Sequence, residues 1–353
     1  MKPTIKDIAA KAGVSKTTVS FALNNPKRIS KETREKILAI VDEMGYFPNP
    51  VARTLTTKRL GSLGLLLPQP LPEVLNNPHL CDIISGIGDE CEKRGFSLTM
   101  LPPVHGKIME AARRSFVDAI VTIGVGPDHE VVEFLNSHGI PFVTIDGEET
   151  SSTVNVGIPD EQAAYDLMRH MLSLGHRKMA ILCVKPDTKS VAENDHRSIV
   201  LEKRLSGFSR ALNEVGLNLV APDISLMETE GSLSGGKNAG EKLFALEPGA
   251  RPTAIVAMAD IIALGAYAAA RGAGLVIPDD VSVAGFDDIE QSSYYEPALT
   301  TVHQSGRQKG QKAASMAVEL LNGGHPAHYR FSCSLIVRQS TGPAPVCAMS
   351  CGF

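Results

Sequence analysis

The sequence predicts a small all-α module followed by a larger α/β body built from doubly wound parallel sheets. Three observations support this fold class. The formal charge changes sign near residue 60, the first 45 residues contain three short helical patterns, and apolar runs alternate with amphipathic segments from residue 60 onward. A chain of 353 residues with 43% hydrophobic residues is long enough for two or three domains with sizeable cores.

The charge is divided unevenly along the chain. Residues 1–60 contain twelve Lys and Arg against five Asp and Glu, a formal charge of +7, whereas the remainder carries −11 and the whole chain −4. A basic module joined to an acidic body is typical of a protein that binds a polyanion through the module. A solvated basic face is the alternative that charge alone leaves open.

Capping residues predict three helices in the basic module, over 5–11, 16–23 and 31–44. Starts are indicated by Thr4 with Asp7 in capping-box spacing, by Ser15 and by Ser30, and stops by Gly13 and Gly45. Helix, short glycine turn, helix and supporting helix is the plan of a helix-turn-helix DNA reader. A protein-docking bundle is the alternative.

The second of these helices favours DNA over a docking role. Its first residues include Lys16, Thr17, Thr18 and Ser20, which are a base and short hydroxyl groups. Such side chains suit phosphates and base edges.

The stretch TIKDIAAKAGVSKTTVSFALN, followed by ISKETREKILAIVDEMGYFPNPVARTL, resembles the DNA-binding headpiece of the lac repressor (LacI/GalR) family of bacterial transcription regulators. The resemblance continues along nearly the whole chain. It implies a headpiece over 1–48, a hinge over 49–60, and double-stranded operator DNA as the partner of a homodimer. The DNA-binding residues that it implies are Thr4, Ser15, Lys16, Thr17, Thr18, Ser20, Phe21, Asn24, Asn49, Ala52, Arg53 and Leu55.

Phe21 departs from the family pattern. The resemblance places base reading at Lys16, Thr17 and Phe21, and a frequent family choice at the last position is Arg. A phenyl ring cannot make a bidentate contact to guanine, although it can touch a thymine methyl. We therefore expect an operator that differs from those of Arg-bearing relatives.

The segment from Pro48 to Leu55 is expected to form a short helix that is marginal alone. Asn49 can cap it and Pro50 can take its first position. A plain linker is the alternative. The resemblance implies a hinge helix that folds on the operator, with Leu55 wedged between base steps in the minor groove.

The acidic body contains eight apolar runs that predict buried strands. They are GSLGLLLP, FSLTML, AIVTIG, PFVTID, MAILCV, ISLM, AIVAM and VSVAGF. Strands alternating with helices predict parallel sheets, and the count suits two lobes. The resemblance implies a periplasmic-binding-protein-like effector and dimerisation domain over 61–345, with an N-lobe over 61–162 and 303–329, a C-lobe over 163–302 and 330–345, and a tail over 346–353.

Three polar residues follow strands or lie in nearby segments of the body, and they suit a polyhydroxylated ligand. Asp146 and Asp287 end strands and Arg204 opens a helix, so carboxylates and a guanidinium are available to hydroxyl groups. Taken singly, each also reads as a surface ion pair or a cap. The resemblance places all three at effector-contacting positions. Ala259 and His79 stand where relatives often carry Asn and Phe, which puts the usual sugars in doubt.

No pattern predicts catalysis, a cofactor or a metal. The six cysteines form no CxxC pair and no zinc spacing, and the P-loop-like stretch 231–238 carries Asn238 where the magnesium-binding hydroxyl belongs. No apolar run reaches the roughly 18 residues that span a bilayer, and the first residues lack the apolar core of a signal peptide. We expect a cytoplasmic protein without a membrane partner.

The resulting hypothesis is an operator-specific repressor of a catabolic operon for a sugar or sugar derivative. A small-molecule effector between the lobes controls it. The tail has no heptad pattern, which favours a dimer. A solute-binding protein that only carries sugars is the alternative, and an enzyme on the same scaffold is a third reading.

Overall fold

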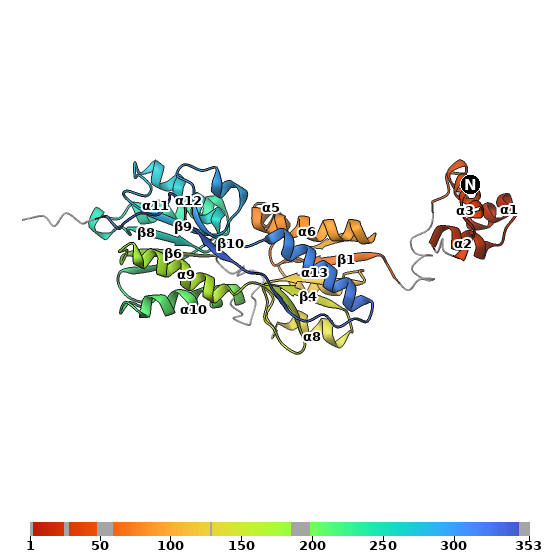
Figure 1. Cartoon of the computed structure of the whole chain (residues 1–353), viewed down its shortest axis with the longest axis horizontal. Helices are drawn as coiled ribbons and strands as arrows, with labels where there is room; N and C mark the ends of the chain where they lie inside the picture. Colours follow the sequence, from red (N-terminus) through yellow and green to blue (C-terminus); the bar gives the residue numbers. More distant parts are fainter. Residues whose placement is uncertain (1–2, 25–27, 48–58, 128, 185–197, 346–353) are drawn as a thin grey trace, which may run out of the picture. The chain divides into compact units, whose positions relative to one another are not determined.

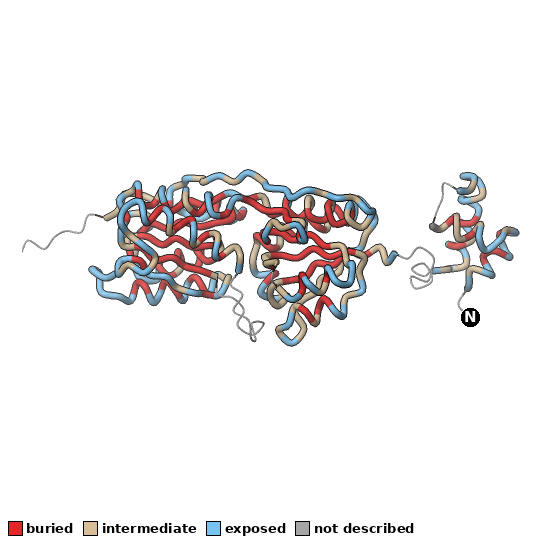
Figure 2. The backbone as a smooth tube through the Cα atoms, turned by 90° about the horizontal axis from the view of Figure 1, so that it is seen from below, coloured by how far each residue is buried: buried red, intermediate tan, exposed pale blue. Residues whose placement is uncertain are grey.

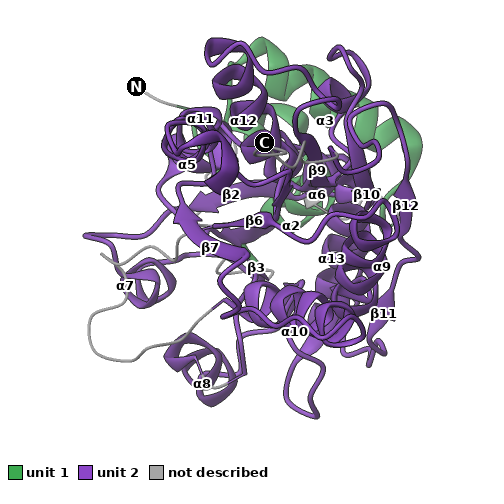
Figure 3. Ribbon diagram, turned by 90° about the vertical axis from the view of Figure 1, so that its left-hand side faces the viewer, with its two compact units in different colours: residues 1–60 green, residues 61–353 purple. Residues whose placement is uncertain are grey.

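Two compact units divide the chain, residues 1–60 and residues 61–353, and each is described by itself (Figure 3). The structure is a computed structural model that describes residues 3–24, 28–47, 59–127, 129–184 and 198–345 (Figure 1). No helix within these ranges is long and apolar enough to cross a membrane.

The described part of the first unit contains three helices around a small apolar core, as predicted. They are α1 (Ile5–Ala12), α2 (Lys16–Asn24) and α3 (Lys31–Glu43). The buried residues of the core are Ile8, Ala9, Ala12, Val19, Ala22, Ile37 and Val41.

The predicted helix signals of this unit are confirmed. The Oγ of Ser15 accepts from the Thr18 N–H at 3.0 Å, and that of Ser30 accepts from the Thr33 N–H at 3.2 Å. At α1, the Thr4 N–H and hydroxyl both donate to the Asp7 carboxylate, at 2.8 and 2.7 Å. Gly13 and Gly45 take the left-handed conformation that lets the chain leave a helix.

The second unit begins with a fully parallel six-stranded sheet of order β11-β5-β4-β3-β1-β2. Its strands are β1 (Ser62–Leu66), β2 (Ser97–Leu101), β3 (Ala119–Ile123), β4 (Phe142–Ile145), β5 (Val154–Gly157) and β11 (Tyr329–Arg330). The helices of this lobe are α5 (Leu71–Leu75), α6 (Pro78–Arg94), α7 (Ile108–Arg113), α8 (Glu130–Ser137) and α13 (Gly306–Leu321).

A second sheet has the order β12-β10-β9-β8-β6-β7, parallel except for β12. Its strands are β6 (Met179–Val184), β7 (Ile224–Thr229), β8 (Ala254–Ala257), β9 (Ser282–Asp287), β10 (Thr300–His303) and β12 (Ser334–Ile336). Its helices are α9 (Asp160–Ser173), α10 (Ile199–Asn213), α11 (Leu233–Phe244) and α12 (Asp260–Gly272), with 3-10 turns η2 (Pro248–Ala250) and η3 (Glu290–Ser293).

The predicted fold class is confirmed: a helical module precedes two doubly wound α/β lobes. All eight expected strands form. Four strands were not predicted, namely β5, β10, β11 and β12, because they are short or carry polar residues. Two predicted strands, β2 and β7, are not fully buried as expected, because they lie at sheet edges. Figure 2 shows the central strands of each sheet running through the buried interior of each lobe.

The chain passes between the two sheets three times, from β5 to α9, from β10 to α13 and from β11 to β12. These passages lie side by side, because β11 pairs with β5 and β12 pairs with β10. Helix α13 returns to the first lobe, where it packs closely on α6. A Cβ on Gly86 would overlap the Arg307 backbone oxygen, and one on Gly310 would overlap that of Ile83.

Candidate DNA-binding and effector sites

Helix α2 presents one polar side to solvent. Lys16 and Thr17 are exposed and Ser20 is half-buried, whereas Val19 and Ala22 face the core. Residues three and four apart share a side of a helix, so Thr17, Ser20 and Phe21 form one surface. This surface carries hydrogen-bonding groups suited to DNA.

Some predicted DNA-binding residues have structural partners within the headpiece. The hydroxyls of Ser15 and Thr18 are hydrogen-bonded to each other at 2.9 Å, and that of Thr4 is bonded to Asp7. Within the described ranges the side chains of Thr17 and Ser20 have no hydrogen bond. The four predicted residues of the hinge, Asn49, Ala52, Arg53 and Leu55, lie outside the described residues. The side chain of Asn24 lies outside them too.

The cations of the headpiece divide into paired and unpaired groups. Lys11 pairs with Glu43 at 2.7 Å and Lys31 with Glu35 at 3.8 Å. In the described part of the chain, Lys16 has no carboxylate partner. An unpaired cation at the start of α2 adds to the positive end of the helix dipole, which attracts phosphate.

The second unit brings three of the predicted effector residues together in a buried group that we call the interlobe cluster. It consists of Asp146, Asp160, Arg204, Asp287, Gln304 and Lys309. Asp146 directly follows β4 and Asp287 ends β9, and these are equivalent strands of the two sheets. Both aspartates have positive φ, 54° and 129°. Such backbone conformations cost energy in residues other than glycine and often mark functional sites.

Lys309 of α13 connects these two aspartates. Its ammonium donates to both Asp146 oxygens, at 2.7 and 2.6 Å, and to Oε1 of Gln304 at 2.5 Å. The Gln304 side-chain amide in turn donates to Oδ1 of Asp287 at 2.5 Å. Within the described residues Oδ2 of Asp287 has no hydrogen-bond partner. The relay therefore runs from one lobe to the other and leaves one carboxylate oxygen for a ligand.

Arg204 lies inside α10 rather than at the start of a helix, because α10 begins at Ile199. Its Nε donates to Asp160 at 3.0 Å, one Nη donates to the Met258 carbonyl at 2.5 Å, and its guanidinium lies 3.5 Å from the Phe286 ring centroid. The second Nη has no partner in the described part of the chain. Arg204 is thus held in place by its neighbours, and its second Nη can still donate to a ligand.

The charges of the cluster do not balance, since three aspartates surround two cations. Burial raises the pKa of Asp287 to about 8, although the Arg204 charge opposes the shift. Burial also raises the pKa of Asp146, against the attraction of Lys309. Burial, followed by the charges of Lys309 and Arg204, holds the pKa of His79 well below its usual range. His79 is consequently neutral and suited to hydrogen bonding rather than to ion pairing.

His79 and Ala259 are both buried near this cluster. His79 is the second residue of α6, and its ring lies beside the start of α13 at Gly306. Ala259 precedes α12 as its N-cap residue. The following Asp260 accepts from Ser292 and Thr301 hydroxyls and serves the internal packing of the second lobe.

Sequence reasoning missed Asp160, Gln304 and Lys309. Of these, Lys309 has the clearest signal in the sequence. It is a lysine at a core position of α13, between Gly306 and Ala313, and lysine is rarely buried without a partner. Gln304 follows a short strand, β10, that was also not predicted.

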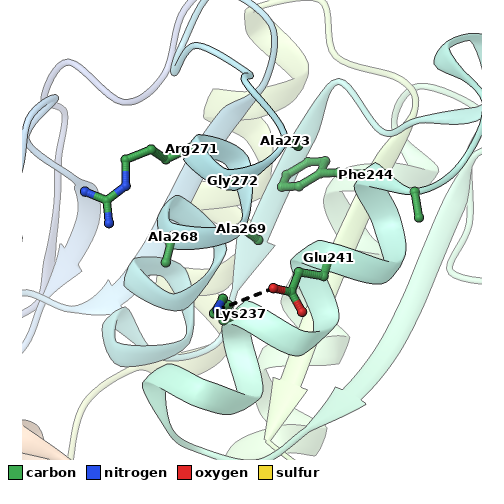
Figure 4. A pocket seen from close by; sticks show the side chains of 9 residues that line it. Lys237, Glu241, Phe244, Ala268, Ala269, Arg271, Gly272 and Ala273 are labelled. Atoms are coloured by element: carbon green, nitrogen blue, oxygen red, sulfur yellow. Dashed lines mark ion pairs between the residues drawn. The ribbon is translucent and has the colours of Figure 1, made fainter.

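A hollow of about 540 Å³ lies elsewhere, between α11 and α12 of the second lobe (Figure 4). None of the predicted site residues lines it, and its Lys237 and Glu241 pair with each other at 3.5 Å. We therefore place the candidate effector site at the interlobe cluster, where buried polar groups have free atoms. The P-loop-like stretch opens α11, where Gly235 and Gly236 pack against the Glu230 and Ile262 backbone rather than around a phosphate.

Comparison with known proteins finds the same two kinds of domain in one chain. Residues 4–49 match the family model described as bacterial regulatory proteins, lacI family, and residues 168–341 match the periplasmic binding protein-like domain. The HTH-type transcriptional regulator DegA of Bacillus subtilis (strain 168) is 32% identical over 97% of this chain and 99% of its own. The chain belongs to the lacI family of bacterial regulatory proteins. It is a DNA-binding transcriptional regulator with an effector-binding domain.

Other lacI-family proteins are similar over most of their length. The HTH-type transcriptional repressor PurR of Vibrio atlanticus (strain LGP32) is 32% identical over 90% of this chain and 91% of its own. The structure of the lac repressor dimer bound to operator and an anti-inducer aligns with a TM-score of 0.79 at 25% identity, covering 97% of this chain and 100% of that one. A ribose-bound lacI-family regulator from Enterococcus faecium aligns with a TM-score of 0.66 at 25% identity, over 80% of this chain and 99% of that one.

Proposed function

We propose that this lacI-family regulator is a homodimeric repressor of a catabolic operon, controlled by a sugar or sugar derivative bound at the interlobe cluster. It acts by binding alone, without a catalytic step, on DNA in the bacterial cytoplasm. The observation that carries the effector assignment is that the buried side chains of Arg204 and Asp287 are fixed by neighbours, and yet one Nη of Arg204 and Oδ2 of Asp287 have no hydrogen-bond partner among the described residues. These two atoms offer a donor and an acceptor to adjacent hydroxyl groups.

The relatives support the partners that we propose. One solved relative is a dimer bound to operator, and another contains ribose. In the proposed assembly, residues 1–48 form the headpiece, residues 49–60 the hinge and residues 61–345 the core. Two headpieces place α2 in successive major grooves of a pseudo-palindromic operator.

The DNA contacts that we propose have two parts. Lys16 and Thr17 reach base edges and phosphates from the exposed surface of α2, and the hinge residues Asn49, Ala52 and Arg53 contact the backbone. Leu55 inserts into the minor groove and kinks the duplex. Replacing Leu55 by Ala is expected to weaken operator binding without unfolding the dimer. Unchanged operator affinity would show that Leu55 is not a wedge.

Control by the effector follows from linkage. A ligand that binds between the lobes changes how closely they approach, and through the hinges it changes the affinity for the operator. Binding of ligand and release of DNA are reciprocal, so an inducer binds the DNA-free form more tightly. A co-repressor instead binds the DNA-bound form more tightly.

The test of the proposal is a gel shift of the gene's own upstream DNA by the full-length protein. A thermal-shift screen of sugars, sugar acids and sugar phosphates identifies the ligand, because a bound ligand stabilises the folded state by mass action. The ligand is then titrated into the gel shift. If no promoter-proximal DNA is shifted with or without ligand, the repressor assignment is wrong.

A matched pair of arginine variants on α10 tests the effector site. Arg204→Ala is expected to abolish the ligand response of a protein that still binds the operator. Arg210→Ala is the control, because Arg210 lies on the same helix but is exposed and pairs with Glu161. Circular dichroism checks that both variants are folded. A retained ligand response in Arg204→Ala refutes the effector role of Arg204.

A further inference from the structure

Phe21 occupies an unusual place for an aromatic side chain in so small a domain. It is half-buried, yet it is not among the described apolar side chains that pack on the headpiece core. It lies four residues after Thr17 on the exposed side of α2 that carries Ser20. The ring is therefore not needed to fill the core.

Arg28 lies against this ring. It follows α2 in sequence, is exposed, and holds its guanidinium carbon 5.4 Å from the Phe21 ring centroid. This distance is within the range of about 6 Å at which a cation is attracted to an aromatic face. In the described part of the headpiece, Arg28 has no carboxylate partner, in contrast to the Lys11 and Lys31 ion pairs. The ring is thus the main described contact of this guanidinium.

This cation–π contact has a chemical consequence. A guanidinium that lies over a ring keeps its N–H groups at its edge, where they remain available to an acceptor. The ring also restricts a long side chain that would otherwise lose considerable rotamer entropy on binding. An oriented guanidinium matches the N7 and O6 acceptors of guanine in the major groove.

We propose that Phe21 and Arg28 act as one unit that reads guanine in each operator half-site. The proposal rests on the DNA-binding function of α2. Phe21 supplies the surface that orients the guanidinium, and Arg28 supplies the donors that a phenyl ring lacks. Arg28 contacts the base, whereas Phe21 is a positioning residue that also borders the groove.

The test is selection of binding sites from a library of random DNA duplexes by the full-length protein, followed by affinity measurement on the selected site. The variants are Arg28→Ala, Arg28→Lys, Phe21→Leu and Phe21→Tyr, with circular dichroism as the check on folding. Wild type is expected to select a guanine at one position of each half-site. Arg28→Ala and Phe21→Leu are expected to lose this preference, with about a 10-fold loss of affinity for each half-site.

The two conservative variants distinguish the guanine reader from simpler roles. Phe21→Tyr keeps the aromatic face and is expected to keep the guanine preference. Arg28→Lys keeps the charge but not the planar fork, so it is expected to lose the preference while retaining most non-specific affinity.

Several results would overturn the proposal. If Arg28→Ala weakens all sequences equally and lowers the salt dependence of binding, Arg28 contacts a phosphate only. If Phe21→Leu keeps the guanine preference, Arg28 does not depend on the ring. If Arg28→Lys keeps it, the contact is not bidentate. A folded wild-type protein that selects no sequence contradicts the DNA-binding function itself, and this proposal with it.

Discussion

The two lobes of the core are built alike but treat equivalent aspartates differently. Both sheets share one strand order, and Asp146 and Asp287 follow the same strand in each. Among the described residues, the Asp146 side chain receives the Lys309 ammonium on both oxygens, whereas that of Asp287 receives only the Gln304 amide on one. The first lobe therefore uses its aspartate for internal pairing, and the second keeps a carboxylate oxygen for a ligand. Similar folds do not imply equivalent sites.

Among the substitutions that test this difference between the lobes, replacement of Lys309 is expected to lower stability most. Lys309→Met removes the only ammonium bonded to Asp146 in the described part of the chain, and leaves a buried carboxylate without its charge partner. The free energy of unfolding is expected to fall by about 3–5 kcal/mol, measured by denaturant titration. Adding Asp146→Asn to this variant should restore part of the loss. If the two changes are simply additive, the pair is not coupled.

The paired variants Asp287→Asn and Asp146→Asn test which lobe binds the ligand. Asp287→Asn is expected to weaken effector binding by roughly 10-fold, because it replaces a carboxyl oxygen that faces the ligand with an amide group. Asp146→Asn is expected to weaken effector binding less than Asp287→Asn does, since the Asp146 oxygens bond Lys309. Calorimetric titration with the ligand found by thermal shift measures both. Equal losses would mean that the two lobes contact the ligand alike.

The pH dependence of stability is expected to differ between Asp287→Asn and wild type. Because the pKa of Asp287 is raised to about 8 in the folded protein, the folded state binds more protons than the unfolded state between about pH 4 and pH 8. This carboxyl therefore makes stability fall as pH rises through that window, by at most about 1.4 kcal/mol per pH unit.

Asp287→Asn removes that contribution, so its unfolding free energy should depend less steeply on pH than that of wild type. Denaturant unfolding at pH 5, 6, 7 and 8 gives the two slopes. Parallel slopes would show that Asp287 is ionised throughout the range.

The smallest expected effect concerns a contact at the edge of the interlobe region. Lys203 of α10 donates to the Gly147 carbonyl at 2.8 Å, which joins the second lobe to the loop after β4. Lys203→Ala should lower the unfolding free energy by about 0.5–1.5 kcal/mol and leave its pH dependence unchanged. A larger loss would indicate that this partly buried bond, rather than the relay through Lys309, joins the lobes.

How much could be predicted from sequence depended on whether the signal was local. The three headpiece helices were predicted within one residue at each end, because their caps lie within three residues of the groups that they satisfy. Asp146, Arg204 and Asp287 were found because they follow strong patterns or match the family. Lys309 was missed because its partner Asp146 is 163 residues away. The Phe21 and Arg28 contact joins α2 to the segment that follows it, and no spacing rule covers such a pair.

The three passages between the lobes have a mechanical consequence. They run side by side, because β11 pairs with β5 and β12 pairs with β10. Together they form a thin hinge between the lobes. Bending about an axis across this hinge strains each passage little. Sliding or twisting one lobe past the other would stretch at least one of them. Hinge bending is thus the lobe motion that these connections resist least. Any ligand that moves the lobes, whatever its chemistry, then acts by changing the angle between them.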